Sequence, residues 1–407
     1  MKLEHLLSDP VSACVHAERY INFKEATRPY TLGVLSPEHS AYKGPEKIVL
    51  ERFKIPRSKA IIHHNHEEES PLEKAFQDEE HVYFIPHPGV RGQGFAEEYE
   101  RLEKMSVEKS TLCADPTASN RTFKVSEPLT SYVKTSFPAR ISGCKRTLHK
   151  EDIEESLWLT QELDFQCGKD NLPKTFSYNR EPLGIEIPLV RRLGGMILRE
   201  YDSFPHHKPL KIPLASVCSP DLKKPEDPLL IEQLAELEGT SVRDYFLERI
   251  VVPLIDIWNW FNFQLGVIPN LHGQNLLYQL DQDFADPLFS FRDFNGNLIN
   301  PCKRVLPSHE DESSKQDILW DQRQLKEYMT LSYDFIIGEL FLDRAIDSLS
   351  ERGIETKGIE EEIAGHFKES YLGEEKDLCP QFVKLGYSKE REMQRVEFKR
   401  ERPKYRR

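Results

Sequence analysis

Two short polar clusters on either side of an apolar run are the part of this sequence best suited to chemistry. Residues 272–275 (His-Gly-Gln-Asn) precede the run and residues 292–296 (Arg-Asp-Phe-Asn-Gly) follow it. Turn residues interrupt the run, which predicts a short β-hairpin between the clusters. Kinase-like sites use an asparagine and an aspartate placed in this way to bind the Mg²⁺ of a nucleotide. Asn275 and Asp293 are therefore the predicted metal ligands, and a surface hairpin with a chance Asn and Asp is the alternative.

Cations and hydroxyl groups gather earlier in the chain, where the sequence alternates between apolar and polar residues. Alternation predicts strands, and side chains two residues apart then share one face of a sheet. Arginine contributes bidentate contacts and lysine a point charge, a combination that suits a polyphosphate. An exposed strand face with ordinary charges is the alternative. The residues concerned are Ser119, Arg121, Thr122, Lys134, Ser142, Arg146 and Thr147.

Two histidine-containing segments are further candidates. In residues 85–95, His87 could bind a carboxylate or transfer a proton and Arg91 could clamp a carboxylate. A Pro-Gly turn with a surface histidine is the alternative there. Residues 63–69 (His-His-Asn-His-Glu-Glu-Glu) could bind a transition metal, but a polar loop is favoured because no second ligand cluster stands out.

Length and composition limit the class of protein. A chain of 407 residues predicts two or three domains. The net charge of −13 argues against nucleic acid as the main partner. No apolar run approaches the roughly 20 residues of a membrane span, and the first residues lack the order of a secretory signal. The seven scattered cysteines indicate reduced thiols, so a cytoplasmic location is expected.

Hydrophobic patterns predict a β-rich half followed by a helical half. The first ~110 residues show short helical pieces and few long periodic runs. Residues 120–200 predict an antiparallel sheet, interrupted by one helix near 151–163 with a stripe of Ile153, Leu157 and Leu163. The Pro-rich stretch 204–228 is a candidate junction.

From about residue 228 the sequence becomes helical. Residues 241–266 predict a long core helix that is bent or starts near Pro253. Further helices are expected near 318–350 and 358–370. The charged tail 388–407 is expected to be a solvated helix or a disordered end.

Taken in order, the motifs resemble those of the NRPS-independent siderophore (NIS) synthetases, the IucA/IucC-like family. Residues 87–91 are similar to its His-Pro-x-x-Lys element and residues 119–122 to its Ser-x-Arg-Thr element. Lys134 then precedes residues 141–147, which are similar to Ile-Thr-Ser-x-x-Arg-Thr. Residues 270–275, followed by an Arg-Asp pair, are similar to Glu-x-His-x-Gln-Asn with its downstream Arg-Asp.

The resemblance implies an α+β fold shaped like a cupped hand, with an antiparallel sheet in the fingers and a helical, distantly kinase-like palm. Residues 1–110 would form a reduced thumb-like region, residues 111–215 the ATP-binding fingers, and residues 216–407 the palm.

The resemblance also implies an AMP-forming ligase of siderophore biosynthesis, and hence a role in iron acquisition. ATP with Mg²⁺ would adenylate a polycarboxylate such as citrate. An amine, hydroxylamine or alcohol would then capture the acyl group as an amide or ester. These small molecules are the expected partners, and homodimerisation is left open.

The family pattern assigns a role to each motif residue. Lys134, Arg146 and His272 would be catalytic, and Asn275 and Asp293 would hold the metal. The nucleotide would contact Ser119, Arg121, Thr122, Lys134, Ser142, Arg146, Gln274, Asn275 and Asp293. The carboxylate substrate would contact His87, Arg91, Arg146, Thr147 and His272.

Four positions depart from the family pattern. Asn270 stands where the family has a glutamate near the metal, and Arg91 replaces a lysine. Gly143 and Cys144 replace a hydroxyl-bearing residue and a small residue near the substrate. A non-catalytic nucleotide-binding relative is kept as an alternative because of Asn270. A small-molecule kinase is a second alternative, because His272, Asn275 and Asp293 also suit phosphoryl transfer.

Overall fold

The computed structural model describes residues 2–21, 40–65, 69–92, 94–141, 144–299 and 331–370. The chain forms two compact units. The first comprises Met1–Ile257 with Gly273–Leu298, and the second Trp258–His272 with Ile299–Arg407. The division expected at residues 110 and 215 stays a prediction.

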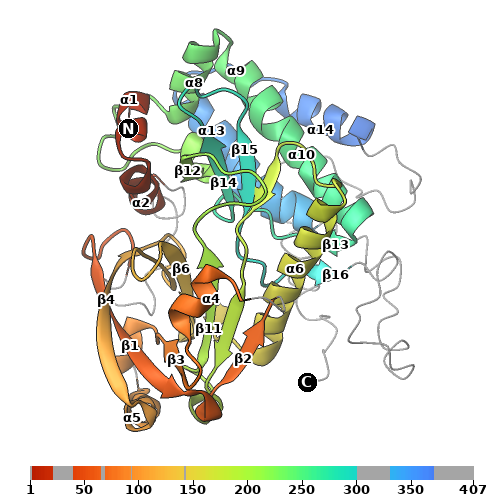
Figure 1. Ribbon diagram of the computed structural model, residues 1–407. Helices are drawn as coiled ribbons and strands as arrows, with labels where there is room; N and C mark the ends of the chain where they lie inside the picture. The colour runs from red at the N-terminus through yellow and green to blue at the C-terminus, as the bar shows by residue number, and fades with distance from the viewer. Residues whose placement is uncertain are drawn as a thin grey trace. The chain divides into compact units, whose positions relative to one another are not determined.

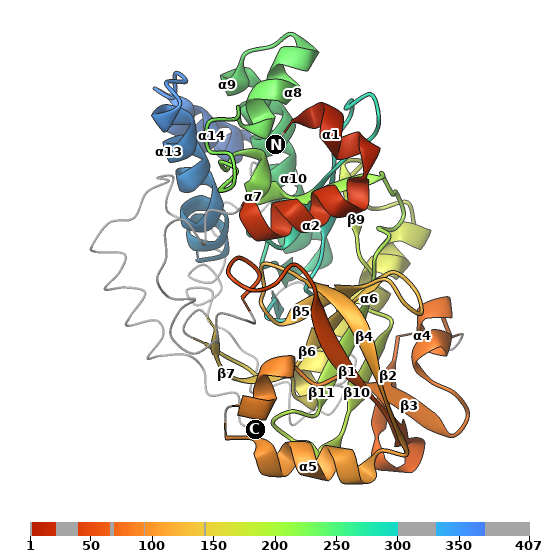
Figure 2. The same ribbon diagram turned by 90° about the vertical axis from the view of Figure 1, so that its left-hand side faces the viewer.

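The first unit contains an eight-stranded sheet that is antiparallel throughout. The antiparallel sheet predicted for residues 120–200 is confirmed. The strand order is β2-β10-β11-β6-β5-β4-β1-β3 (Figures 1 and 2). The strands are β1 (Ile48–Pro56), β2 (Ile61–His64), β3 (His81–Phe84), β4 (Glu108–Pro116), β5 (Thr122–Val125), β6 (Ser131–Thr135), β10 (Leu183–Glu186) and β11 (Gly195–Glu200).

Half of this sheet comes from residues 48–116, where the sequence pattern had not predicted strands. In β1 the regular alternation of apolar and polar residues is broken, because its polar residues find partners on neighbouring strands of the sheet. Glu51 pairs with Lys109 at 2.7 Å, and Arg52 donates to Ser110 Oγ at 3.0 Å while its guanidinium lies over the Tyr83 ring.

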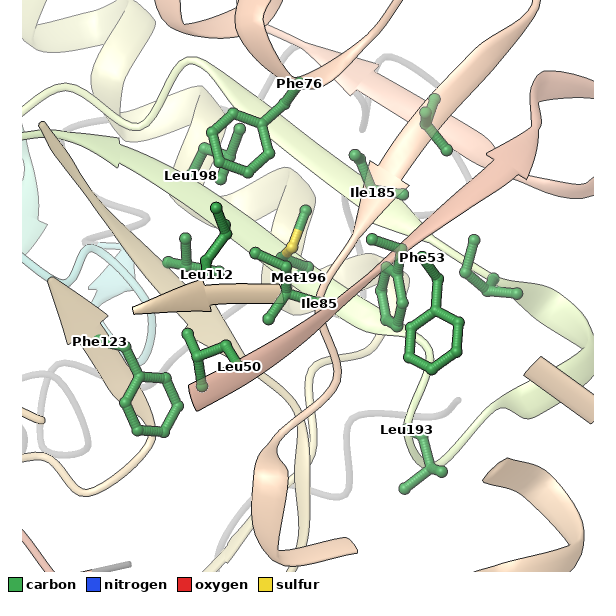
Figure 3. Close-up of a cluster of buried hydrophobic side chains, with 14 of the residues drawn as sticks. Leu50, Phe53, Phe76, Ile85, Leu112, Phe123, Ile185, Leu193, Met196 and Leu198 are labelled. Carbon is green, nitrogen blue, oxygen red and sulfur yellow. The ribbon is translucent and has the colours of Figure 1, made fainter. Parts of the chain in front are cut away.

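One face of the sheet carries the main hydrophobic core. Strands β5, β6 and β11 contribute Phe123, Val133 and Met196 to it. Figure 3 shows Phe123 and Met196 in this cluster. The helices α4 (Pro71–Phe76) and α5 (Ala96–Met105) add Phe76, Tyr99 and Leu102 to the same cluster.

The opposite face packs against α6 (Lys150–Gly168), as Figure 1 shows. Ile153 and Leu157 of α6 cluster with Ile197 of β11, so the predicted helix and its apolar stripe are confirmed. The helix lies so close to β10 that a Cβ atom on Gly184 would come within 2.1 Å of Ile153 Cγ2. Only glycine fits at this crossing.

A second, four-stranded sheet in the same unit has the order β12-β14-β15-β9. Its strands are β9 (Phe176–Tyr178), β12 (Leu210–Pro213), β14 (Leu276–Leu280) and β15 (Leu288–Phe291). The predicted hairpin is confirmed, because β14 and β15 pair antiparallel with Leu276 opposite Phe291. By contrast, β15 runs parallel to β9, so both strands end at the same edge. The small hairpin of β7 (Phe137–Ile141) and β8 (Cys144–Arg146) places Arg146 opposite Phe137.

Helices complete the first unit, and α2 packs against β12 (Figure 1). The long helix predicted near Pro253 is confirmed: residues 242–265 are helical, with π-helical turns on both sides of the α-helical segment that contains Pro253. Proline has no N–H, which disturbs regular α-helical hydrogen bonding. The elements are α1 (Leu3–Ser8), α2 (Pro10–Tyr20), η3 (Arg57–Lys59), η4 (Pro88–Gly92), η5 (Pro188–Val190), α7 (Leu214–Val217), α8 (Leu230–Glu238), α9 (Val242–Tyr245), η6 (Phe246–Val251) and α10 (Val252–Asn259).

The second unit is held together by aromatic packing. The Trp258 ring contacts those of Tyr333 and Phe367, and its Nε1 donates to Ser332 Oγ at 3.1 Å. Helix is confirmed for residues 331–351 and 359–370, while 318–330 and the charged tail lie outside the described residues. None of the described helices is long and apolar enough to cross a membrane. The remaining elements are η7 (Trp260–Leu265), β13 (Val267–Ile268), β16 (Leu298–Ile299), η9 (Leu331–Leu342), α13 (Asp343–Glu351) and α14 (Ile359–Ser370).

Candidate functional site

The centre of the candidate site is an ion pair between Lys134 Nζ and Asp293 Oδ1. Lys134 lies on β6, on the sheet face opposite the main core, and its side chain is fully buried. Asp293 follows β15 and keeps 22% of its side chain exposed. The structure therefore brings together the residue predicted to bind phosphate and the residue predicted to bind metal.

Arg199 is a third member of this cluster and is not among the residues predicted for the nucleotide site. Its Nη2 lies 3.5 Å from Asp293 Oδ1, and its Nε and Nη2 donate to Glu181 Oε1 at 2.7 and 2.5 Å. The register of β11 on β6 sets Ile197 opposite Lys134, so Arg199, two residues further on, points to the same face. Alternation along β11 was the signal available in the sequence. Nothing in the sequence indicated that Glu181 would be its partner.

Two further arginines approach the same region. Arg121 is buried and its Nη1 donates to the carbonyl of Arg146 at 3.0 Å. Arg121 directly precedes Thr122, which pairs with Lys134 across β5 and β6. The Arg121 side chain therefore lies beside the backbone of Arg146, and the phosphate roles of Lys134, Arg121 and Arg146 stay predictions.

Burial and mutual charge control the protonation of this cluster. Burial raises the pKa of Asp293, but Lys134, Arg199 and Arg121 outweigh it and hold that pKa well below the usual range. Burial lowers the pKa of Lys134 despite the attraction of Asp293. Burial also lowers the pKa of Arg121 to about 10, with the nearby charge of Arg146 acting in the same direction. Asp293 therefore stays ionised at neutral pH.

The cations at this place outnumber the carboxylates once Glu155, which is mostly protonated at neutral pH, is left out of the count. Lys134, Arg121 and Arg199 are buried, and they face the partly exposed carboxylate of Asp293 and the buried carboxylate of Glu181. The charge of Arg146 adds to the positive side and that of Asp152 to the negative side. A buried excess of positive charge is costly unless an anion offsets it. The residues therefore fit a polyphosphate.

The loop after Asp293 is held by the start of α6. Asp293 has a left-handed backbone, with φ of 71°. Asn295 Nδ2 donates to Asp152 Oδ1 at 3.0 Å, and the Gly296 amide donates to Glu155 Oε1 at 3.1 Å. Burial, with the like charge of Asp152, raises the pKa of Glu155 to about 8. Helix α6 thus fixes the direction in which Asp293 leaves the hairpin.

Hydrogen bonds from Arg292 connect the two ends of the β14–β15 hairpin. The Arg292 amide donates to the Asn275 carbonyl at 2.9 Å, and its guanidinium donates to the Gln274 carbonyl at 2.9 and 3.2 Å. Asn275 and Arg292 are both buried. The two predicted metal ligands, Asn275 and Asp293, therefore stand at neighbouring ends of paired strands.

The Ser-x-Arg-Thr segment forms a tight turn. Ser119 Oγ accepts the amide of Thr122 at 2.9 Å and that of Arg121 at 3.4 Å. Asn120 adopts a left-handed conformation with φ of 58°. Thr147 is half-buried just after β8, whereas Ser142 and Gly143 lie outside the described residues.

His87 and Arg91 make other contacts. His87 is buried against Phe137, with ring centroids 4.3 Å apart. Its Nδ1 accepts the Gly89 amide at 3.0 Å, so the proton is on Nε2, which donates to the Asn120 carbonyl at 2.9 Å.

Arg91 lies in a surface ion-pair cluster, in which its side chain is 60% exposed. It pairs with Glu51 at 3.4 Å and lies over the Tyr99 ring. The substrate roles of Arg91 and His87 stay predictions.

Two assigned positions fall in the second unit. The His272 amide donates to the Asn270 carbonyl at 3.1 Å. The roles predicted for His272 and for the departure at Asn270 stay predictions.

No ready-made metal centre of side chains is present in the described part of the chain. No three His, Cys, Asp or Glu residues gather there in a way that could hold an ion. His63 and His64 lie on β2, where His64 Nδ1 pairs with Glu73 at 2.9 Å.

Comparison with known proteins shows a family likeness over part of this chain. The model of the IucA / IucC family matches residues 41–219. The resemblance predicted from the motifs is therefore confirmed. No curated protein sequence matches the chain.

Three solved structures share its fold. The petrobactin biosynthesis protein AsbB from Bacillus anthracis aligns with a TM-score of 0.61 at 13% identity, covering 87% of this chain and 67% of that one. Aerobactin synthetase IucC from Klebsiella pneumoniae gives 0.59 at 14% identity, covering 83% and 65%. ATP-bound aerobactin synthetase IucA from Klebsiella pneumoniae gives 0.57 at 15% identity, covering 80% and 61%. The likeness at these identities concerns the fold, and this chain spans less than two thirds of each aerobactin synthetase.

Proposed function

We propose that this protein is an AMP-forming ligase of siderophore biosynthesis. It uses ATP with Mg²⁺ to adenylate a polycarboxylate, and it passes the acyl group to an amine, hydroxylamine or alcohol. The observation that carries the proposal is the buried cluster of Lys134, Arg199 and Arg121 around Asp293, with positive charge in excess. We further propose the arrangement of thumb, fingers and palm, with an antiparallel sheet in the fingers and a kinase-like palm.

In this proposal, some residues of the site bind the metal and others bind the phosphates of ATP. Asp293 and Asn275 would hold Mg²⁺, which supplies charge neutralisation on the phosphates when bound. Lys134, Arg121 and Arg199 would offset the charge that grows on the leaving pyrophosphate. Ionised Asp293 fits this role because its pKa is held low by the same cations.

The proposed reaction has two chemical steps. A carboxylate oxygen forms a bond to the α-phosphorus, the bond to the bridging oxygen breaks, and pyrophosphate leaves. The nitrogen or oxygen of the second substrate then forms a bond to the acyl carbon, and AMP leaves with the bonding electron pair. The proton released by the nucleophile goes to a base, for which His272 is the proposed residue.

The decisive test is the nucleotide product formed with Mg²⁺, ATP, a panel of carboxylic acids and a panel of amines. AMP with pyrophosphate supports the proposal. The direct Lys134–Asp293 pair also suits phosphoryl transfer, so a small-molecule kinase is the second candidate. Formation of ADP without AMP would establish the kinase instead, and binding without turnover would favour a non-catalytic relative. The cytoplasmic location and a homodimer stay predictions.

A further inference from the structure

Glu18 is a buried carboxylate that neither the motifs nor the family match takes up. It lies on α2, before the matched residues 41–219, and only 2% of it is exposed. Its two oxygens contact two segments that are far apart in the sequence. Oε2 accepts the Ala118 amide at 3.0 Å, and Oε1 forms an ion pair with Arg292 Nη2 at 2.5 Å.

Each of these segments carries residues of the proposed nucleotide site. Ala118 opens the turn that presents Ser119 and Arg121. Arg292 directly precedes Asp293, and its guanidinium also donates to the Gln274 carbonyl. One carboxylate therefore joins the turn that would bind phosphate to the hairpin that would bind metal.

We propose that Glu18 is a positioning residue that fixes the spacing between residues 117–122 and the ends of the β14–β15 hairpin. The contacts it makes among the described residues are not with predicted ligands, so it acts through Ala118 and Arg292. The inference rests on the proposed function, because the spacing matters only where phosphates and metal bind together.

The docking of α2 does not depend on Glu18 alone. His16, on the same helix, places Nε2 at 2.8 Å from Asp221 Oδ2. Arg19 donates from Nη1 to the Pro45 carbonyl at 2.8 Å and from Nη2 to the Gly44 carbonyl at 3.0 Å. These anchors hold the helix without reaching the site, so the two contacts of Glu18 are available for a separate task.

Glu18→Gln tests this role in the full chain, with His16→Ala as the matched control. Glutamine has one carbonyl oxygen and no charge, so it cannot satisfy both Ala118 and Arg292. His16→Ala removes an ion pair from the same helix but leaves both contacts intact. By titration calorimetry we expect Glu18→Gln to weaken Mg-ATP binding by about tenfold or more and His16→Ala to change it less than about twofold.

Amide hydrogen exchange separates a positioning role from a purely stabilising one, because loss of a purely stabilising residue would not accelerate exchange at these segments in particular. In Glu18→Gln, exchange should accelerate at residues 117–122 and also at 274–276 and 290–293, and in His16→Ala at neither place. Equal affinity in the two variants, or loss of protection spread evenly over the unit, would overturn the inference. If the wild-type protein binds no Mg-ATP, the proposed function fails, and the exchange pattern still decides the role of Glu18.

A second variant covers the case in which Glu18→Gln does not fold. Arg292→Lys keeps a positive charge opposite Glu18 but loses the planar donors to the Gln274 carbonyl. We expect weaker Mg-ATP binding with faster exchange at the hairpin ends only, because Ala118 keeps its acceptor. Unchanged binding and exchange in Arg292→Lys would contradict the proposal.

Discussion

Replacing Asp293 by asparagine removes the negative charge that three buried cations share. Asparagine tolerates the left-handed backbone at this position, so the substitution changes charge with little strain. Breaking a buried ion pair by removing one partner costs about 3–5 kcal/mol. Because 22% of the Asp293 side chain is exposed, we expect the lower end, about 3 kcal/mol. At about 2–4 °C per kcal/mol, the unfolding temperature should fall by about 6–12 °C.

The sign of the pH dependence follows from the depressed pKa of Asp293. A carboxyl group whose pKa is lowered in the folded protein stabilises it above the pKa of the unfolded chain, near 4. That stabilisation is lost as the pH falls further. The difference in stability between wild type and Asp293→Asn should therefore be full at pH 7 and shrink below about pH 4.

Thermal unfolding with and without Mg-free ATP measures the effect. The variant has a larger unpaired positive charge, so ATP should raise its unfolding temperature more than that of the wild type. Turnover should fall about 10²-fold or more, since a predicted metal ligand is lost. Asp286→Asn is the matched control, because Asp286 also has a positive φ but is exposed on the same hairpin. Unchanged stability in Asp293→Asn would refute the charge argument, and unchanged turnover would refute the metal assignment.

Three further substitutions test neighbouring parts of the site. The free energy of unfolding of Glu155→Gln should increase relative to that of the wild type as the pH rises from 4.5 to about 8. The raised pKa of Glu155 means that ionising this group destabilises the folded protein. Unfolding measured across that pH range checks this. Arg199→Lys should lose the two-nitrogen contact with Glu181 and lower stability by about 1.5–3 kcal/mol, with weaker ATP binding by calorimetry; normal ATP affinity would remove Arg199 from the site. His87→Phe should leave the Asn120 carbonyl without its donor and cost about 1–3 kcal/mol in chemical denaturation, and an unchanged midpoint would show that this hydrogen bond contributes nothing.

The local sequence pattern predicted those parts of the site whose geometry depends on residues close together in the sequence. The apolar run between Asn275 and Asp293 contains its own turn, so the hairpin and the closeness of its ends followed from the sequence. Alternation likewise predicted the strands β5 and β6, on which Thr122 and Lys134 stand opposite each other. Helix α6 was recognisable from its stripe of Ile153, Leu157 and Leu163.

Partners that are distant in the sequence could not be predicted in the same way. Arg199 binds Glu181 and approaches Asp293, and Glu18 binds Arg292, yet no periodicity links these positions. Their pairing depends on how the two sheets and α2 pack. The strands of residues 48–116 were missed for a related reason, since their polar residues find partners only once the sheet exists.

The parallel pairing of β9 with β15 has a consequence for the order of folding. Glu181 follows β9 and Asp293 follows β15, and both strands end at the same edge. Parallel neighbours need a long crossover, so this pair closes a loop that contains the strands β10 to β14. Contacts that close long loops form late in folding. During refolding, ATP-binding competence should therefore lag behind the eight-stranded sheet, and a nascent chain that has not yet reached β15 would hold Lys134 and Arg199 without the carboxylate of Asp293.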